Sequence, residues 1–426
     1  MTTSSTSLWS RESLLLWAKQ RGEPDWLVQQ RLSAWNALEQ LSWPRWERTD
    51  LPPLDDQRLQ PAESDVAGAQ EGLRQQLGIT AEGKTLVLPG GTIEDRSALP
   101  EDVLFEDLGQ AVLGSGDHWQ RWLGALVPAQ TDRFTALATA LWQSGTLLYV
   151  PKGCQIDVPL ESYLWLPQGG AWYSRTLLML EPGAKVTLVL GSAGPRQGEV
   201  LHAGILEGYV SAGARLQLVI LQNNGAEADL FLQRHLRVAR DGQVSWVLGD
   251  FGGGLQHTVT ATDLSETGAS MESWSVMVVG RGQHDDLEVI ATHDAPNTRS
   301  EMETRQVVTE DGEAVYQGTT DIHRGARGTV AYNRERTLLL SDEAHADALP
   351  VLRIDENDVV ASHAASAGEV DPEQLFYLES RGIPEPLAIE MIVAGFLAPL
   401  LDRIPVATVC QQISQLVQAK LGGSVR

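Results

Sequence analysis

A histidine near the C-terminal end of the chain, His363, has small side chains around it: Ser362 before it, and Ala364 and Ala365 after it. Small neighbours let a second backbone or an inorganic group approach the ring, and a neutral imidazole is a competent ligand for iron. On the residues alone, a histidine satisfied inside a core is the more common alternative. His363 is therefore a candidate metal ligand. Its surroundings in the fold must decide between this role and that of a satisfied core histidine.

The other histidines give no metal-binding pattern. The nine histidines include no His-x-His or His-Glu-x-x-His spacing, and these spacings are typical of metal sites. The cluster His284-Asp285-Asp286 could bring nitrogen and carboxylate ligands together, but such a cluster is more often a solvated loop. His293-Asp294-Ala295-Pro296 is typical of a polar turn between strands. We assign neither segment a role.

The chain has two cysteines, Cys154 and Cys410, which lie far apart in the sequence. They can form neither a disulfide framework nor a Cys-x-x-Cys metal motif, and this usage is typical of a reducing compartment. Cys154 follows a turn at the start of a strand-rich region, and Cys410 has core-like spacing with Ile413 and Leu416. We interpret both cysteines as structural residues.

Residues 78–85, Gly-Ile-Thr-Ala-Glu-Gly-Lys-Thr, match the letters of the phosphate-binding P-loop. That motif works only between a strand and a helix whose N-terminal amides hold the phosphates. Here the preceding residues 70–77 predict a helix, and Leu86-Val87-Leu88 predict a strand that stops at Pro89. Because the order of the elements is reversed, we expect no nucleotide binding at this segment.

Composition narrows the class of protein. The chain has 426 residues, 42% of them hydrophobic, and a net charge of −24. It is therefore expected to pack into a globular fold, and it has no basic field to recruit nucleic acid or anionic membranes. The apolar run Met391 to Leu401 is too short to span a bilayer, which takes about 20 residues, and the run Leu14 to Ala18 is too short for a secretory signal. We expect a cytoplasmic protein.

The first of three zones, residues 1–145, has helical periodicity and predicts an N-terminal helical domain. Asp25 is placed to begin a helix that runs to Gln40. A loop rich in proline, aspartate and glutamine follows this helix. Further helices are expected over residues 102–126 and 131–143.

The second zone, residues 146–365, has a period of two and frequent glycine, which indicates β-strands. A turn pair followed by alternating apolar and polar residues recurs at Gly183, Gly213 and Asp241, and more weakly at Gly268 and Asp311. These copies start 30, 28, 27 and 43 residues apart, and the last interval has room for one unrecognised copy. Repeats of this length predict a β-solenoid, with an evenly spaced β-sandwich as the alternative.

The third zone, residues 366–426, is helical again and predicts a C-terminal helical domain. Asp371-Pro372 suits the start of a short helix over residues 373–380. A second helix is expected from Pro384, and a third over residues 406–420. The second helix is apolar around most of its circumference, so it is either buried on several sides or docks a partner.

Longer segments of the chain resemble one known family. The segment around His363 leads directly into the amphipathic stretch that ends at Arg381-Gly382-Ile383, and together they resemble the signature of the SufB/SufD family, scaffold proteins for iron–sulfur cluster assembly. The likeness covers about two thirds of the chain, from Trp142 onward. It includes Gly252-Gly253-Gly254, His293 to Ser300, Tyr316-Gln317-Gly318, Leu338 to Ser341 and Asp347 to Pro350. The segment Trp43 to Asp50, the short C-terminus and the histidine of the signature are most like the SufD branch.

This resemblance implies a mainly β protein, with a right-handed parallel β-helix core flanked by the two helical domains. It implies pairing with a SufB-type subunit through β-helix edges, docking of a SufC-type ABC ATPase on the C-terminal helices, and a homodimer as an alternative where SufB is absent. It also implies that His363 joins SufB side chains around a nascent iron–sulfur cluster that is held transiently. The sequence does not decide whether a flavin binds.

The sequence departs from the family signature at two positions. The family usually has Cys-Ser-His-Gly-Ala, whereas here Ala361 replaces the cysteine and Ala364 replaces the glycine. Since thiolates are the normal iron–sulfur ligands, any cluster site would depend on His363 and on cysteines of the partner. We therefore expect a non-enzymatic, SufD-type scaffold subunit. The alternative is a β-helix enzyme acting on carbohydrate, which would need clustered acidic residues on one solenoid face.

Overall fold

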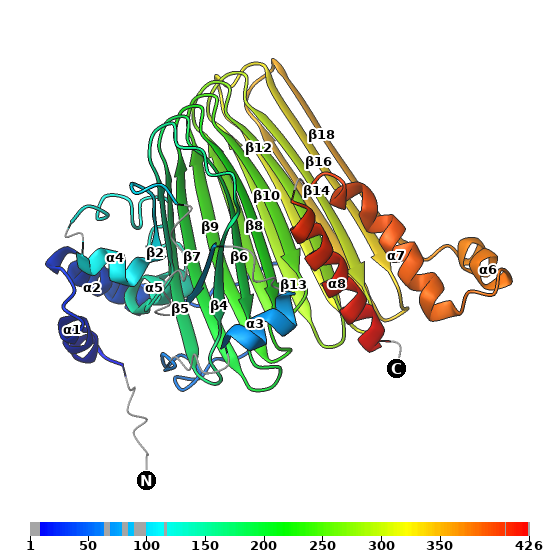
Figure 1. Cartoon of the computed structure of the whole chain (residues 1–426), viewed down its shortest axis with the longest axis horizontal. Coiled ribbons are helices and arrows are strands. Elements are labelled where there is room, and N and C mark those ends of the chain that lie inside the picture. The colour runs from blue at the N-terminus through cyan, green and yellow to red at the C-terminus, as the bar shows by residue number, and fades with distance from the viewer. Residues whose placement is uncertain are drawn as a thin grey trace, which may run out of the picture.

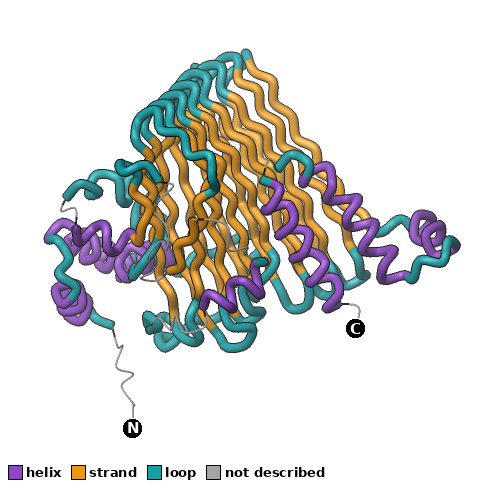
Figure 2. Tube along the Cα trace, viewed as in Figure 1, coloured by secondary structure: helices purple, strands orange, loops and turns teal. Residues whose placement is uncertain are grey.

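The computed structural model describes residues 9–63, 69–78, 84–88, 99–114, 117–404 and 406–424. Two long parallel sheets face each other as a β-solenoid, and helices lie against the outside at both ends of the chain (Figure 1, Figure 2). The predicted mainly β solenoid with flanking helices is therefore confirmed. The sandwich alternative is wrong, because each strand pairs in parallel with the strand one coil later.

Alternate strands of the chain build the two sheets. Within the described residues, the first sheet consists, in spatial order, of β1 (Lys84–Leu88), β4 (Leu160–Trp165), β6 (Lys185–Ala193), β8 (Arg215–Asn223), β10 (Gln243–Asp250), β12 (Ser270–Val279), β14 (Arg299–Val308), β16 (Thr329–Leu339) and β18 (Val359–Glu369). The second consists of β17 (His345–Ile354), β15 (Glu313–Ile322), β13 (His284–His293), β11 (Leu255–Leu264), β9 (Ala228–Val238), β7 (Val200–Val210), β5 (Ala171–Leu180), β3 (Thr146–Val150) and β2 (Leu104–Asp107). Only β2 joins its neighbour antiparallel among these strands.

Six successive coils enter the first sheet through a residue with a left-handed backbone. These residues precede β6, β8, β10, β12, β14 and β16, and their φ angles lie between 54° and 78°: Gly183, Gly213, Asp241, Gly268, Asn297 and Gly328. Asn297 is a copy that the sequence pattern missed, because asparagine replaces the glycine and tolerates this conformation. The weaker copy at Asp311 belongs to another corner, ahead of β15 in the second sheet.

Inward-facing side chains fill the space between the sheets, since successive residues of a strand point to opposite faces. One row of register partners in the first sheet runs through Leu188, Leu218, Trp246, Ser273, Met302, Asn333 and His363. Its early members are fully buried, and each such apolar side chain stabilises the fold by about 1.5–3 kcal/mol. The row becomes polar toward its C-terminal end, where it reaches His363.

The N-terminal helices cover parts of both sheets. They are α1 (Arg11–Gln20), α2 (Asp25–Gln40), α3 (Ala69–Leu77), α4 (Leu108–Gly114) and α5 (Arg133–Leu141). The helices predicted at residues 25–40 and 131–143 are confirmed. The helix predicted over residues 102–126 is wrong, because β2 and the short α4 share its first half, and Asp117 to Val127 forms turns. The apolar residues of that stretch pack against the sheet and α5. These contacts, and not a helix, explain their spacing.

A buried arginine fixes the N-terminal helices to the end of the solenoid. Arg31 of α2 donates hydrogen bonds to the carbonyls of Ala140 and Trp142, at 2.9 and 3.0 Å, and pairs with Glu23 at 2.7 Å. Its guanidinium carbon lies 4.7 Å from the centroid of the Trp17 ring and 4.8 Å from that of the Trp142 ring. A buried charge is tolerated only when it is paired and hydrogen-bonded, and both conditions are met here.

Three C-terminal helices follow the last strand: α6 (Pro372–Ser380), α7 (Glu385–Leu401) and α8 (Ala407–Ser424). Asp371 caps α6 by accepting the backbone N–H of Glu373 at 2.9 Å, as predicted from its position before Pro372. Helices α7 and α8 pack on the outer face of the first sheet, and α6 lies apart from the solenoid (Figure 1).

The predicted division at residues 145 and 365 stays a prediction. The structure adds that β1 and β2, both from the first zone, join the solenoid sheets, and that β18 extends to Glu369.

Candidate functional site at the open end of the solenoid

His363 lies near the middle of β18, the last strand of the first sheet. In register it stands beside Asn333 of β16 and on the same face of the strand as Val359 and Ala361, which pack against the buried Ala331 and Ile322. This alternation directs His363 toward the interior of the final coil. The small residues around it in sequence lie on an exposed strand, so no bulky side chain of its own segment covers the ring.

Both ring nitrogens of His363 are shielded from solvent, and neither has a hydrogen-bond partner among the described residues. Burial lowers the pKa of His363 below its ordinary value, so the ring is neutral at physiological pH. The alternative of a satisfied core histidine is therefore not what the structure shows. A neutral imidazole with an unused lone pair can bind a metal ion without first losing a proton.

Further polar side chains with unused capacity face the same interior. The Asn333 side chain accepts a hydrogen bond from Tyr316 at 3.3 Å, but its amide nitrogen has no partner. Glu335, two residues along β16, accepts from Gln306 at 3.2 Å through Oε1, while Oε2 has no partner. Unpartnered buried polar atoms occur in other parts of the described chain too, but in the final coils three such residues, Asn333, Glu335 and His363, face one interior.

Glu335 is an acid that stays protonated in this interior. It is 2% exposed, and burial raises its pKa to about 8, opposed by a hydrogen bond from Thr337. At neutral pH the side chain is therefore largely a neutral carboxylic acid, able to donate a proton. A strongly perturbed acid beside an unpartnered histidine is a common feature of functional sites.

Sequence reasoning found His363 and missed Asn333, Glu335 and Tyr316. In the sequence, Tyr316-Gln317-Gly318 carries only a resemblance to the family. The structure explains the glycine, because a Cβ at Gly318 would overlap the side-chain amide of Asn333. The available signal was the alternation in β16, which places Asn333 and Glu335 on the face that should be apolar.

The final coil leaves the solenoid interior uncovered. No described strand pairs with the outer edges of β17 and β18. Inward-facing apolar residues that would be buried in an earlier coil are exposed here, with Leu352 at 44% and Ile354 at 41%. Unpaired strand edges readily accept another chain, so this end has both the backbone groups and the apolar surface for pairing.

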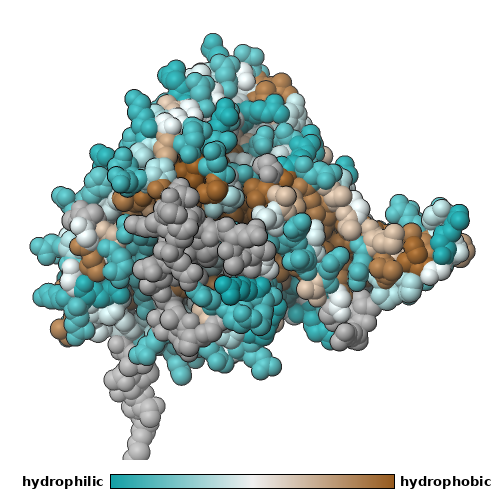
Figure 3. All heavy atoms as spheres, in the orientation of Figure 1, coloured by the Kyte–Doolittle hydropathy of each residue, from teal (hydrophilic) through white to brown (hydrophobic). Residues whose placement is uncertain are grey.

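A second exposed apolar surface lies on the C-terminal helices. Phe376 and Tyr377 of α6 are 71% and 57% exposed, and Leu387 and Met391 of α7 are 48% and 47% exposed. Apolar side chains gather along α7 toward α6 (Figure 3). Helix α7 packs against the sheet and α8 through other residues, namely Val393, Leu397 and Leu400. The four exposed side chains are therefore available to a partner.

The cysteines do not join the candidate site. The Cys410 thiol donates to the carbonyls of Leu401 and Ile404 at 3.4 and 3.5 Å, in keeping with a structural role. Cys154 is partly buried against the core of the first coils, and burial raises the pKa of its thiol. In the part of the chain that the structure describes, no three histidine, cysteine or acidic side chains converge as a complete metal site.

The interpretation of His284-Asp285-Asp286 as a solvated loop is wrong. The segment opens β13, and Asp285 and Asp286 are buried. Thr49 of the N-terminal region donates to Asp286 at 2.5 Å and lies 2.9 Å from Nε2 of His284. These residues therefore hold the segment after Trp46 onto the second sheet.

His293 is likewise more than part of a turn. Its ring is fully buried at the end of β13 and contacts the hydroxyls of Thr298 and Ser300, at 2.8 and 2.9 Å. It therefore ties the end of β13 to the following turn and to the start of β14 in the other sheet.

The described parts of the P-loop-like segment have the expected order. Helix α3 ends at Leu77, and β1 begins at Lys84. Residues 79–83 and the segment after Leu88 lie outside the described residues, so the absence of nucleotide binding stays a prediction.

Comparison with known proteins identifies relatives along almost the whole chain. Residues 165–396 match the family described as SUF system FeS cluster assembly, SufBD core domain, and residues 91–161 match the SufBD protein N-terminal region. An iron–sulfur cluster assembly SufBD family protein of Staphylococcus saprophyticus is 27% identical over 95% of this chain and 91% of its own length. Family proteins of Staphylococcus epidermidis and Staphylococcus aureus are also 27% identical, over 96% and 95% of this chain and 92% and 91% of theirs.

The core-domain match runs from the last residue of β4 into α7 and so includes the inward-facing His363, its neighbours Asn333 and Glu335 and the open final coil. No helix among the described residues is long and apolar enough to cross a membrane. With more than half of its length matched by the core-domain family alone, this chain belongs to the SufBD family of iron–sulfur cluster assembly proteins.

Proposed function

We propose that this chain is a cytoplasmic, non-catalytic scaffold subunit of the SufD type, which pairs with a SufB-type subunit and binds a SufC-type ABC ATPase. Family membership supports a role in cluster assembly and does not favour the alternative of a carbohydrate-active enzyme. The observation that carries the SufD assignment is His363, an unpartnered histidine at the open end whose own segment has no cysteine.

In this role His363 supplies one nitrogen ligand to a nascent iron–sulfur cluster, which is the cargo of the assembly. Its neutral ring offers a lone pair directly, and thiolates of the SufB-type partner supply the other ligands. Because the pKa of Glu335 is about 8, a minor carboxylate form exists at neutral pH, and this form can accept the proton that a thiol of the partner loses as it becomes a ligand. A cluster shared in this way leaves easily, because this chain alone holds too few ligands to retain it.

The open end supplies the surface for the SufB-type partner. A strand of the partner can continue either sheet by hydrogen bonding to β17 or β18, and its core can cover Leu352 and Ile354. Such pairing brings the side chains of the partner directly over His363. Without that partner, a second copy of this chain can use the same edges to form a homodimer.

The exposed apolar surface of α6 and α7 supplies the ATPase contact. Helices that present apolar side chains to solvent commonly dock into a groove of a partner. Because α7 also packs on the first sheet, movement of a docked ATPase would be transmitted to the solenoid through this helix.

The test is to co-express His363→Ala with a SufB-type subunit and a SufC-type ATPase and to purify the complex without oxygen. We expect normal complex formation, because His363 makes no hydrogen bond that the fold would lose, and a clear loss of bound iron and acid-labile sulfide. His235→Ala is the matched control, since His235 lies on the outer face of β9 and pairs with Asp263. Wild-type iron and sulfide in the His363→Ala complex would contradict the assigned role.

A further inference from the structure

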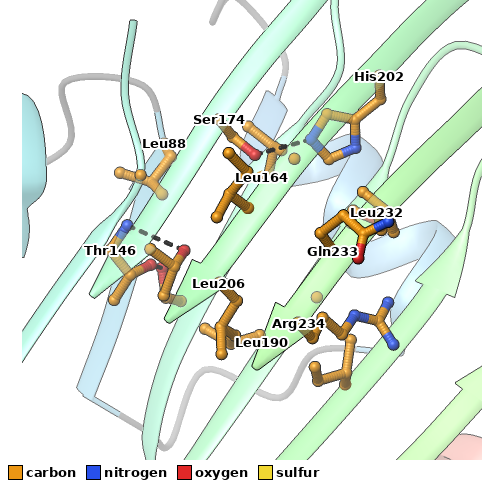
Figure 4. A pocket seen from close by; sticks show the side chains of 18 residues that line it. Leu88, Thr146, Leu164, Ser174, Leu190, His202, Leu206, Leu232, Gln233 and Arg234 are labelled. Atoms are coloured by element: carbon orange, nitrogen blue, oxygen red, sulfur yellow. Dashed lines mark hydrogen bonds between the residues drawn. The ribbon is translucent and has the colours of Figure 1, made fainter. Parts of the chain in front are cut away.

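A cavity of about 100 Å³ lies between the two sheets in the first half of the solenoid, remote in sequence from His363. Its walls combine leucine and isoleucine side chains with a few polar groups. The polar lining residues are Thr146, Ser162, Ser174, Thr176, Ser192, His202, Gln233 and Arg234. Figure 4 shows the hydrogen-bonded pair Ser174 and His202 toward the top of the view and Arg234 toward the bottom.

Arg234 is an inward-facing residue of β9, in register with Leu206 of β7 and Thr260 of β11. It is only 5% exposed. Among the described residues, nothing hydrogen-bonds to its Nη1 atom, and no acidic side chain lies within ion-pair distance of the guanidinium. The buried ion pair Arg175–Glu207, with its 2.7 Å contact, shows how the same solenoid normally treats a buried arginine.

The nearest acids compensate the charge of Arg234 only in part: burial lowers the pKa of Arg234, and the charges of Asp250 and Asp285 raise it without either acid forming an ion pair with the guanidinium. Asp250 and Asp285 are both buried, and burial raises the pKa of each; the neighbouring charge of Asp250 raises that of Asp285 further. The raised pKa values of the two acids favour their neutral forms, whereas an arginine stays charged in proteins. A buried charge without a partner costs several kcal/mol, so a counter-charge in the cavity would stabilise the fold.

His202 and Ser174 add polar groups to the lining of the cavity but no charge. Burial lowers the pKa of His202 to about 3, with a further contribution from Arg234, so the ring is neutral. Its Nε2 atom lies 2.8 Å from the hydroxyl of Ser174, and its Nδ1 atom has no partner among the described residues. Hydroxyl and N–H groups can donate to an anion, while the leucine walls exclude a bulky or highly hydrated one.

We propose that this cavity is a binding site for a small monovalent anion, held chiefly by the guanidinium of Arg234. The volume admits a small ligand such as a halide or nitrate, with or without a few waters. A single cation near two acids supports one negative charge rather than two. This proposal does not depend on the partners or on His363. Its test can therefore succeed or fail whatever the outcome for cluster assembly.

The direct test uses bromide as the probe. Crystals of the full chain are soaked in sodium bromide, and anomalous difference density is measured at the bromine absorption edge. We expect a peak against the Arg234 guanidinium, between β7 and β9. Absence of a peak there would show that the cavity holds only water and would overturn the assignment.

A solution measurement checks affinity and charge class. The thermal unfolding midpoint of the wild-type chain should rise with sodium bromide relative to sodium gluconate at equal ionic strength, and sodium sulfate should not reproduce the rise. Arg234→Met keeps much of the side-chain volume and removes the charge, so it should fold and lose at least about tenfold in bromide affinity. Arg234→Lys, which keeps the charge, should retain part of the response.

Arg237→Met is the matched control, because Arg237 lies on the same strand but is exposed and paired with Asp263. It should respond to bromide as the wild type does. An equal response in Arg234→Met and Arg237→Met would place the bromide effect elsewhere and contradict the site. A response to sulfate as strong as that to bromide would contradict the monovalent class.

Discussion

Glu335 is a carboxylic acid in the interior of a solenoid whose rows are otherwise mostly apolar or neutral. Its neighbours in register are Thr304 of β14 and Ala365 of β18, and neither carries a charge. The site thus combines a neutral histidine with a neutral acid. Both owe their protonation states to burial, which disfavours the charged form of either group.

Replacement of Glu335 by Gln should change how stability depends on pH. Because burial raises the pKa from 4.5 to about 8, the folded protein binds one more proton than the unfolded chain between these values. The favourable contribution is complete below pH 4.5 and is lost as the pH rises through 8. Relative to wild type, Glu335→Gln should therefore gain about 2–4 kcal/mol of unfolding free energy between pH 5 and pH 8.

Denaturant unfolding at a series of pH values measures this difference. The exposed Glu343 of the β16–β17 turn, replaced by Gln, is the control and should leave the pH dependence unchanged. Parallel curves for wild type and Glu335→Gln would show that Glu335 is ionised in the folded state.

At the scale of elements, α7 packs against the rest of the chain, whereas α6 is exposed. Helix α7 is anchored by apolar side chains that face the sheet and α8, whereas α6 contributes no buried residue. A helix with no buried side chain gains little from packing within its own chain. Its large exposed aromatic residues are therefore best explained by a contact with another protein.

Phe376→Ala should weaken binding of the SufC-type ATPase by about tenfold, in line with loss of an aromatic contact at an interface. Stability should change by less than about 0.5 kcal/mol, because the side chain is 71% exposed. Calorimetric titration of the ATPase into each variant measures the effect. Leu16→Ala is the control, with a 62% exposed apolar residue on α1, and an equal affinity for both variants would contradict docking on α6.

At the scale of the whole molecule, the solenoid is closed at one end and open at the other. The N-terminal helices and β2 cover the first coils, while β17 and β18 end in solvent among the described residues. Stacked-repeat proteins need their terminal coils capped, because each coil buries its inner face against the next. The open end therefore predicts an assembly in which another chain acts as the cap.

Leu352→Glu should abolish pairing at the open end while leaving the fold intact, since Leu352 is already 44% exposed. Placing a charge at the centre of an apolar interface leaves it desolvated and unpaired. Co-purification with the SufB-type subunit, and sedimentation of the chain alone, should both show the loss. Val158→Glu, at a residue 43% exposed near the first coils, is the control. Undiminished pairing in Leu352→Glu would place the interface elsewhere.

The sequence by itself determined the repeating architecture and most of the helices. Turn residues such as Gly183, the alternation of the strands and the cap at Asp371 are local features, because they depend on the backbone preferences of a few adjacent residues. The residue most suggestive of chemistry, His363, was also found locally, from its small neighbours and its resemblance to a family. Where the pattern failed, over residues 102–126, apolar spacing was set by contacts with the sheet rather than by a helix.

Only the tertiary structure decided what surrounds His363 and what lies inside the earlier coils. Asn333 stands beside His363, and Tyr316 reaches Asn333, because the solenoid returns the chain to the same place once per coil and stacks residues that are far apart in sequence. The isolation of Arg234 is likewise a property of the folded interior, since its environment comes from strands of several coils. Burial and the absence of a partner are relations between distant residues, and so they cannot be read from local sequence preferences.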